Sequence, residues 1–467
     1  MLFTSFLMFL VFSTFKSYSV AQGNMRPMEG HSMMMNRLGV INLMFVLMLL
    51  MTSMDVIALT PGMTLFNNWF NLTVYNLPLM MLMLLLMMSL LMYNTSVHKY
   101  DLKSPFYMLM LMSNIMGLLL FPLVNDLLAL YMMVELQSYS LYLLTGLHNR
   151  SYNASRASLL YFLMGGVASA MMLLASYFMY ATTGTTNLSD MAMFYSYNNA
   201  YDYFNMLLMA LLFKMGMAPL HRWSMAVYNY APTYMTAYMS VVAKMSMASW
   251  MFANANLFNH YMLMIFFYMS LFIAAYKPLF QVNLKTMLAY SGLLNFGYML
   301  LSMMSFDMSF YMYMMQYVLT HMMLFLGILA ASQYMKSPMS TWSPLMYMHQ
   351  LKLPNLTLAV CLMLALFSLM GIPPLPGFYA KLYMLSGALQ ENYMLETITM
   401  IICSVVATYY YANMIKMLIN SKTIKDNINM NNINPSLAYI LSISTVLLMS
   451  FYMFLPSISE ALYLMTM

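Results

Sequence analysis

The sequence predicts an all-α polytopic membrane protein with about fourteen transmembrane helices, of which the seventh and twelfth are broken. Composition is the first observation behind this prediction: 63% of the 467 residues are hydrophobic and 6% are charged, whereas soluble proteins carry about 25% charged residues. This deficit excludes a soluble enzyme, a disordered chain and a nucleic-acid-binding protein. The net charge of +6, spread without a basic cluster, likewise indicates no nucleic-acid partner.

Apolar segments long enough to cross a bilayer recur along the whole chain, so membrane lipids are their expected surroundings. A bilayer core is crossed by about 20 residues of helix. The first segment is expected to be a span and not a signal peptide, because no basic residue precedes its apolar run. The fourteen expected spans are Leu2–Phe15, Leu38–Leu59, Leu77–Tyr93, Pro105–Val124, Asp126–Leu147, Ala157–Ala181, Tyr203–Pro219, Thr233–Ala255, Asn259–Tyr276, Met287–Met304, Ser309–Leu329, Leu356–Met384, Thr397–Met414 and Ala438–Phe454.

The distribution of basic residues supports an even number of spans. Loops that follow odd-numbered spans hold 15 of the 18 Lys and Arg residues, whereas loops that follow even-numbered spans hold none. Basic loops stay on the side from which the chain inserts, so both termini are expected on the opposite side. The basic loop residues are Lys16, Arg26, Arg37, Lys99, Lys103, Arg150, Arg156, Arg222, Lys277, Lys285, Lys336, Lys352, Lys416, Lys422 and Lys425.

Four charged residues lie inside apolar segments: Glu135, Lys214, Lys244 and Lys381. A charge at the centre of a span costs about 2.5–3.5 kcal/mol on insertion scales. A buried lysine also loses its proton readily, because desolvation disfavours the ammonium. The four residues therefore indicate a path for protons or other ions. The alternative is that they pair only to hold helices together.

The seventh and twelfth spans each contain a helix break with the pattern Gly-x-x-Pro-Leu. Gly and Pro this close together break a membrane helix, and the freed carbonyls are tolerated only against protein or a wet cavity. Because the two spans are five apart, the copies run in opposite directions, which predicts an inverted repeat with a transport site between the copies. The break residues are Gly216 and Pro219 in the seventh span, and Gly371, Pro373 and Pro374 in the twelfth.

Several polar residues accompany these charges. Ser138 and Tyr142 share a helical face with Glu135, which could hold water or a hydrogen-bond chain. His221 lies beside the first break and His321 lies within the eleventh span. Both histidines are candidate proton relays, with a hydrogen-bonded packing role as the alternative.

No cofactor or metal is expected in this chain. The sequence contains no Gly-rich phosphate loop, no nucleotide-binding fingerprint and no His pair at the spacing of haem ligands. Its two cysteines, Cys361 and Cys403, lie in apolar runs and make neither a disulfide framework nor a metal set. If the chain moves ions uphill, the energy must come from elsewhere.

Taken together, these motifs resemble the antiporter-like proton-pumping subunits of NADH:ubiquinone oxidoreductase, respiratory complex I, over about residues 125–411. Any single motif would be weak, and their combination makes the resemblance specific. Two positions depart from many relatives: Leu160 stands where a lysine is common, and Asn295 stands where histidine is often found. The matching segments are Glu135–Ser138, Phe213–His221, Ala231–Thr233, Asn283–Ser291 and Gly371–Lys381.

The resemblance implies fourteen transmembrane helices that include two inverted five-helix repeats. It also implies that Glu135 pairs with Lys214, and that Lys244 links this pair to Lys381 during proton translocation. The implied division of the chain is helices 1–3 in residues 1–104, the first repeat (helices 4–8) in 105–255, the second repeat (helices 9–13) in 256–417, and helix 14 in 418–467.

The resemblance further implies a place in the mitochondrial inner membrane, beside the other subunits of complex I, including neighbouring antiporter-like subunits. FMN, the iron–sulfur clusters and ubiquinone are expected on other subunits, so this chain is part of a proton-translocating enzyme without performing redox chemistry itself. Two alternatives stay open: a stand-alone cation/proton antiporter of related fold, and a scaffold that only spaces neighbouring subunits. The scarcity of further acidic groups inside the spans argues against a sodium site.

Overall fold

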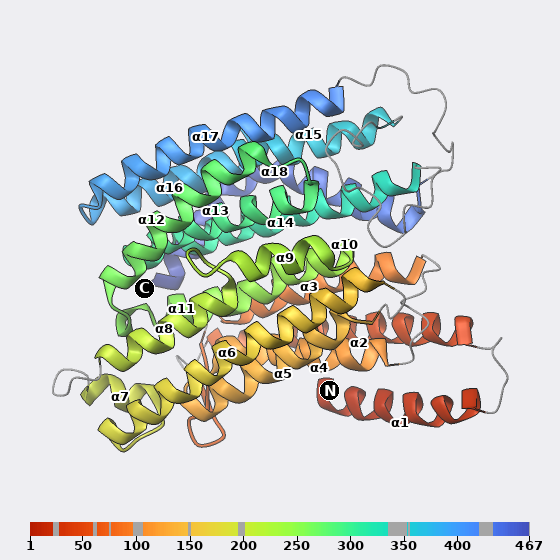
Figure 1. The fold of residues 1–467 in the computed structure, drawn as a ribbon, viewed down its shortest axis with the longest axis horizontal. Coiled ribbons are helices and arrows are strands. Elements are labelled where there is room, and N and C mark those ends of the chain that lie inside the picture. Colours follow the sequence, from red (N-terminus) through yellow and green to blue (C-terminus); the bar gives the residue numbers. More distant parts are fainter. Residues whose placement is uncertain are drawn as a thin grey trace. The chain divides into compact units, whose positions relative to one another are not determined.

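The computed structural model describes most of the chain, and the described part is almost entirely helical (Figure 1). In hydrocarbon no water satisfies the backbone N–H and C=O groups, so a spanning segment must pair them internally, as a helix does. The described part also contains a small antiparallel sheet, in which β1 (Met63–Leu65) pairs with β2 (Phe70–Leu72). The described residues are 1–21, 28–58, 63–73, 76–96, 106–147, 151–194, 201–334, 353, 355–419 and 433–466.

Eight helices of the described residues are long and apolar enough to cross a membrane by length and composition, so the chain is a multi-pass membrane protein. These eight are Met34–Ser53, Leu127–Thr145, Tyr152–Thr183, His260–Phe280, Leu284–Met304, Ser309–Ala331, Met394–Ile419 and Pro435–Ala461. Shorter apolar helices cover Leu2–Thr14, Asn76–Met92, Tyr107–Leu123, Tyr203–Met215 and Leu356–Met370.

The chain folds as two compact units. The first comprises residues 1–214 and 242–253. In it α4 lies along α5, and α5 lies along α6, which brings polar residues of three successive helices together. Its helices are α1 (Leu2–Ala21), α2 (Met28–Ala58), α3 (Asn76–Ser96), α4 (Tyr107–Leu120), α5 (Leu127–Thr145), α6 (Tyr152–Thr183), α7 (Leu188–Phe194), α8 (Tyr201–Met215) and α11 (Lys244–Ala253).

The second unit comprises residues 215–241 and 254–467. Its most enclosed element is α13, whose apolar window is 100% buried, against 22% for α18. Helices α12, α14, α16 and α17 all pack on α13. The helices of this unit are α9 (Arg222–Tyr230), α10 (Thr233–Tyr238), α12 (His260–Tyr276), α13 (Leu284–Met304), α14 (Ser309–Ala331), α15 (Leu356–Met370), α16 (Pro376–Gln390), α17 (Met394–Ile419) and α18 (Pro435–Thr466).

The structure adds detail that the apolar runs do not reveal. The expected span Thr233–Ala255 contains a π-helical turn, Met239–Ala243, between α10 and α11. The short helices α7 and α9 and the β1–β2 hairpin were not expected. Eight of the basic loop residues lie outside the described residues: Arg26, Lys99, Lys103, Arg150, Lys336, Lys352, Lys422 and Lys425.

Candidate functional site

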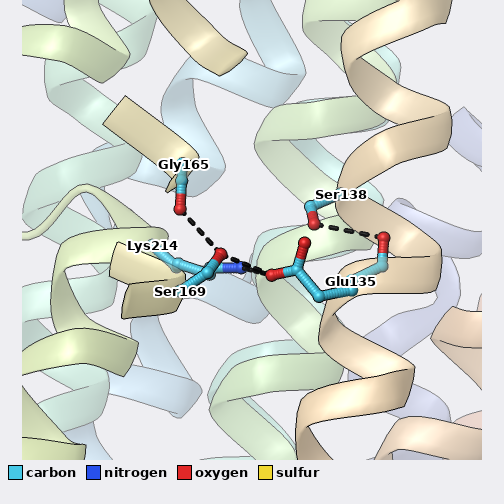
Figure 2. Close-up of polar contacts among 5 residues, drawn as sticks. All are labelled: Glu135, Ser138, Gly165, Ser169 and Lys214. Carbon is cyan, nitrogen blue, oxygen red and sulfur yellow. Dashed lines mark hydrogen bonds and ion pairs between the residues drawn. The ribbon is translucent and has the colours of Figure 1, made fainter. Parts of the chain in front are cut away.

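Glu135 of α5 and Lys214 of α8 form a buried ion pair (Figure 2). The Lys214 Nζ donates a hydrogen bond to Glu135 Oε1 at 3.0 Å, and the side chains are 4% and 11% exposed, respectively. Removing two charges from water is costly, and close contact with further hydrogen bonds offsets that cost. The carboxylate of Glu135 and the ammonium of Lys214 are therefore in contact and neutralise each other inside the protein.

Ser169 of α6 completes the surroundings of the pair, and the sequence did not single it out. Its hydroxyl lies within hydrogen-bonding distance of both Glu135 Oε1 and the Gly165 carbonyl (Figure 2). One hydroxyl carries one proton, so it donates either to the carboxylate or to the carbonyl. An ionised Glu135 accepts that proton, whereas a protonated Glu135 can donate to Ser169 while Ser169 donates to Gly165. Ser169 thus accommodates both charge states of Glu135.

The two polar residues expected on the Glu135 face have different surroundings. The Ser138 hydroxyl donates to the Glu135 backbone carbonyl at 3.2 Å and not to its carboxylate (Figure 2). The Tyr142 ring packs edge-on against Tyr161 with centroids 4.6 Å apart, and it lies close to Gly165. The face is buried, and its contacts with α6 hold α5 in position.

Lys244 is buried at the first position of α11, directly after the π-helical turn. Two residues further on, the Ser246 hydroxyl donates to Gln137 Oε1 at 3.4 Å, which joins α11 to α5. On its other side α5 is held by α4, because Asn114 Nδ2 donates to the Gln137 carbonyl at 2.7 Å. Gln137 therefore fixes the helix that begins with Lys244 to the helix that carries Glu135. No sequence pattern indicates this bridge.

Lys381 of α16 is held by backbone and not by a carboxylate. Its Nζ donates to the carbonyls of Leu369 at 2.9 Å and Met370 at 3.1 Å, the last residues of α15. The carboxyl end of a helix carries partial negative charge and free carbonyls, so it attracts a cation. Lys381 Nζ also lies 5.7 Å from the centre of the Tyr298 ring, within range of a cation–π interaction.

Both predicted helix breaks are present, and each depends on its glycine. Gly216 follows α8 with φ of 69°, and Gly371 follows α15 with φ of 89°, in the left-handed region that favours glycine. A Cβ at Gly216 would lie 2.5 Å from Ser224 Oγ, and one at Gly371 would lie 3.4 Å from Lys381 Nζ. Cis peptide bonds precede Pro219 and Pro374.

His321 belongs to a buried polar group on facing sides of α13 and α14. Asn295 Nδ2 lies 3.2 Å from His321 Nε2, and Asn295 Oδ1 accepts a hydrogen bond from Tyr313 at 2.5 Å. The Asn295 amide nitrogen is a donor, so this contact uses His321 Nε2 as the acceptor. The Tyr317 ring packs at a tilt against His321 with centroids 4.3 Å apart, and its hydroxyl donates to the Ser240 carbonyl at 3.1 Å. Ser240 lies in the π-helical turn that precedes Lys244.

The second candidate histidine lies elsewhere in the same unit. His221 immediately precedes α9 and its ring faces Tyr290 with centroids 6.0 Å apart. Both rings are close to the first break, as the sequence predicts for His221. The contact with Tyr290 fits a packing role as well as a relay.

Lys285 was expected in a basic loop, and this expectation is wrong. The structure places it in the first turn of α13, where it is 3% exposed. Its Nζ donates to the Ala231 carbonyl at 2.8 Å, at the carboxyl end of α9. There the ammonium complements the partial negative charge of the helix end. Lys285 is therefore a further buried cation, and it fastens the corner between α9 and α10.

Among the described residues, no group of three or more His, Cys, Asp or Glu side chains is arranged to hold a metal ion. The first unit contains the buried ion pair and the buried Lys244. The second unit contains Lys285, Lys381, the polar group around His321 and both helix breaks. Such groups can hold and exchange protons.

Comparisons with known proteins show which family the chain belongs to. Residues 124–409 match the family described as "NADH:quinone oxidoreductase/Mrp antiporter, TM". The NADH-ubiquinone oxidoreductase chain 2 of Debaryomyces hansenii is 71% identical over 467 residues, which is 100% of both chains. The chain 2 protein of Candida albicans is 48% identical over 92% of this chain and 91% of its own length.

Solved structures share the fold. A chain of respiratory complex I from Thermus thermophilus matches with a TM-score of 0.80 at 21% identity, over 99% of both chains. A chain of the Mrp complex from Dietzia sp. DQ12-45-1b matches with a TM-score of 0.78 at 16% identity, over 93% of this chain and 92% of that one. On these likenesses, the chain belongs to the NADH:quinone oxidoreductase/Mrp antiporter transmembrane family, within its NADH-ubiquinone oxidoreductase chain 2 branch.

Proposed function

We infer that the chain is a proton-translocating membrane-arm subunit of NADH:ubiquinone oxidoreductase in the mitochondrial inner membrane. Electrons pass from NADH to ubiquinone on other subunits, where FMN and the iron–sulfur clusters are expected. The energy released there drives protons through this chain and its antiporter-like neighbours. One observation supports this most strongly: the buried Glu135–Lys214 pair in a chain 71% identical to a chain 2 protein.

The Glu135–Lys214 pair can couple a change of charge on a neighbouring subunit to the release of a proton from Lys214. At an effective dielectric constant of about 20, opposite charges 3 Å apart interact by roughly 5 kcal/mol. A change of charge or conformation near Glu135 that opens the pair removes this energy from the protonated form of Lys214. The ammonium is then buried without a partner, and it releases its proton.

We propose that the proton next passes to Lys244 and Lys381, with His321 and His221 as candidate relays. Each of these residues is buried or part-buried, where a permanent charge would be costly. Lys381 can hold a proton at the carboxyl end of α15, and it can release the proton without leaving a buried carboxylate behind.

The finer architecture is proposed along the same lines. Fourteen transmembrane helices would include two inverted five-helix repeats, in residues 105–255 and 256–417, with helices 1–3 in 1–104 and helix 14 in 418–467. The breaks at Gly216 and Gly371 have the same backbone conformation, because each glycine ends a helix in the left-handed region. This similarity supports the division into two repeats. An inverted repeat lets one half open to each side of the membrane in turn.

A stand-alone cation/proton antiporter is the second candidate, favoured by the likeness of fold to a chain of the Mrp complex. Purification in mild detergent distinguishes the two. A complex I subunit should elute in a large particle that oxidises NADH and reduces ubiquinone, and the separated chain in liposomes should exchange no cations. Sodium or potassium exchange by the chain alone, driven by a pH gradient, would instead establish the antiporter.

Ser169→Ala tests the surroundings of the pair. The change removes a hydrogen bond to a charged group, which is worth about 1.5–3 kcal/mol, while Lys214 stays in contact with Glu135. We expect the number of protons pumped per NADH to fall severalfold in membrane vesicles, with normal amounts of assembled complex. Ser176→Ala is the matched control on α6, since its hydroxyl donates to the Leu173 carbonyl. Equal pumping in the two variants would remove Ser169 from the mechanism.

A further inference from the structure

Helix α5 carries an exposed stripe that runs directly beside Glu135. We name it the outer stripe of α5, and its members Leu128, Met132, Tyr139 and Leu143 are 52–61% exposed. They follow one another at steps of four, seven and four residues, which is the spacing of a single helical face. Glu135 lies three residues after Met132 and four before Tyr139, so it borders this stripe although it is itself buried.

The two carboxylate oxygens of Glu135 have different surroundings. Lys214 Nζ and the Ser169 hydroxyl both approach Oε1, from inside the first unit. The other oxygen points away from both of them (Figure 2). An ionised carboxylate accepts hydrogen bonds at both oxygens, and burying a polar atom without a partner is unfavourable. The second oxygen therefore requires a donor other than Lys214 and Ser169.

Tyr139 is placed to supply this donor from the outer stripe. It lies one helical turn after Glu135, and its hydroxyl interacts with the Glu135 side chain. Its ring packs edge-on against Tyr142 with centroids 5.9 Å apart, and Tyr142 is in turn fixed against Tyr161 of α6. The other three members of the outer stripe are apolar, so Tyr139 is the member that can donate a hydrogen bond.

A lipid-facing packing role is the ordinary explanation for an exposed tyrosine in a membrane helix. Such tyrosines concentrate at the two membrane–water interfaces, where the hydroxyl reaches water. Tyr139 lies inside its helix, 12 residues after Leu127 and 6 before Thr145. Leucine or phenylalanine would cover the same surface there without bringing a hydroxyl into hydrocarbon. The position of the hydroxyl is explained better by a polar partner, and Glu135 is that partner.

We propose that Tyr139 is a positioning residue of the Glu135–Lys214 pair, whose hydroxyl donates a hydrogen bond to the second oxygen of ionised Glu135. This rests on the proposed function of the pair in proton translocation. Lys214 and Ser169 hold the carboxylate from inside the unit, and Tyr139 holds it from the outer stripe. A hydrogen bond to the charged form of an acid favours that form. Tyr139 therefore helps to keep Glu135 ionised and paired, while the phenol keeps its own proton.

Tyr139→Phe tests this role when protons pumped per NADH are measured in membrane vesicles over a range of pH. The change removes one hydroxyl and keeps the exposed ring, so the complex should assemble in normal amounts. Ionised Glu135 loses a donor, so the pH below which pumping is lost should rise by about one unit. Among the described residues, the titratable side chains that interact with Glu135 are Lys214, Tyr131, Tyr139 and Tyr142. Of these, the variant changes Tyr139 alone.

Tyr177→Phe is the matched control, because Tyr177 is a 64% exposed tyrosine of the neighbouring helix α6. It should pump with the natural pH profile. A packing role of Tyr139 would change the amount of assembled complex and leave the pH profile where it is. An unmoved profile in Tyr139→Phe overturns the positioning role.

Infrared difference spectroscopy of the purified complex separates this proposal from the proposed function, because it reads the charge of Glu135 without pumping. Glu135→Gln assigns the carboxyl band. If the band titrates at higher pH in Tyr139→Phe, the positioning role stands, even where Lys214→Met pumps normally and the proposed function fails. If Lys214→Met loses pumping but the band does not move in Tyr139→Phe, the function stands and the positioning role is overturned.

Discussion

Lys214→Met should leave the complex assembled but reduce NADH-driven proton pumping at least about tenfold. The attraction between the two charges is roughly 5 kcal/mol at an effective dielectric constant of about 20, and a net loss of 1.4 kcal/mol already corresponds to a factor of ten in rate. Methionine keeps most of the length of the side chain, but it leaves Glu135 buried without a cation. The carboxyl group then takes up a proton and no longer responds to charge movements on neighbouring subunits. Protons pumped per NADH in membrane vesicles measure the effect.

Two further variants make this result specific. Glu135→Gln should lose pumping to a similar degree, because it removes the other half of the same pair. Lys277→Met is the control, since Lys277 is an exposed lysine at the end of α12. Pumping at the natural ratio in Lys214→Met, with the complex intact, would show that the buried pair is structural only.

Gly377→Ala is expected to have the second-largest effect, because it pushes the two halves of the second broken helix apart. A Cβ on Gly377 of α16 would lie on the Ser368 carbonyl oxygen of α15 and 3.1 Å from Gln316 Nε2 of α14. Overpacking of a filled interior costs about 1–3 kcal/mol, and any shift moves Lys381 away from the carbonyls that hold it. The amount of assembled complex and its thermal inactivation temperature should both fall.

Gly166→Ala provides the control for this change. Gly166 also lies in a helix, α6, but a Cβ there would meet nothing within 4 Å. Replacing a helical glycine by alanine at an open position stabilises a helix by about 0.5–1 kcal/mol. If Gly377→Ala assembled as well as Gly166→Ala and pumped normally, the close crossing of α15 and α16 would not matter for the mechanism.

Much of the fold follows from the length of the apolar segments and from the lack of hydrogen-bonding partners in the lipid interior. Helices occur in every expected span, because a backbone in lipid has few other ways to pair its polar groups. Helix α9 was not expected, since its nine residues include Arg222 and several polar side chains and form no long apolar run. It is stabilised by packing, with Trp223, Val227 and Tyr228 buried, and such contacts between distant segments leave no local pattern.

The charged pair of the candidate site was predictable because a charge is expensive to bury, and the helix breaks were predictable from their Gly and Pro residues. Glu135 and Lys214 stand out because charge inside a span is costly, and the structure brings them together. Ser169 carries no such signal, since a serine that bonds the preceding turn of its own helix is ordinary. Lys285 was visible as a charge but was misplaced, because α13 begins one residue before it.

The complete enclosure of α13 has a consequence for the biogenesis of this chain. A helix with Ser291, Asn295 and Ser302 along its length would expose these groups to lipid tails until α14, α16 and α17 surround it. The stable insertion of α13 therefore depends on α14, α16 and α17, which are synthesised after it. Truncation of the chain before α17 should strand α13 at the translocation machinery or send it to membrane proteases.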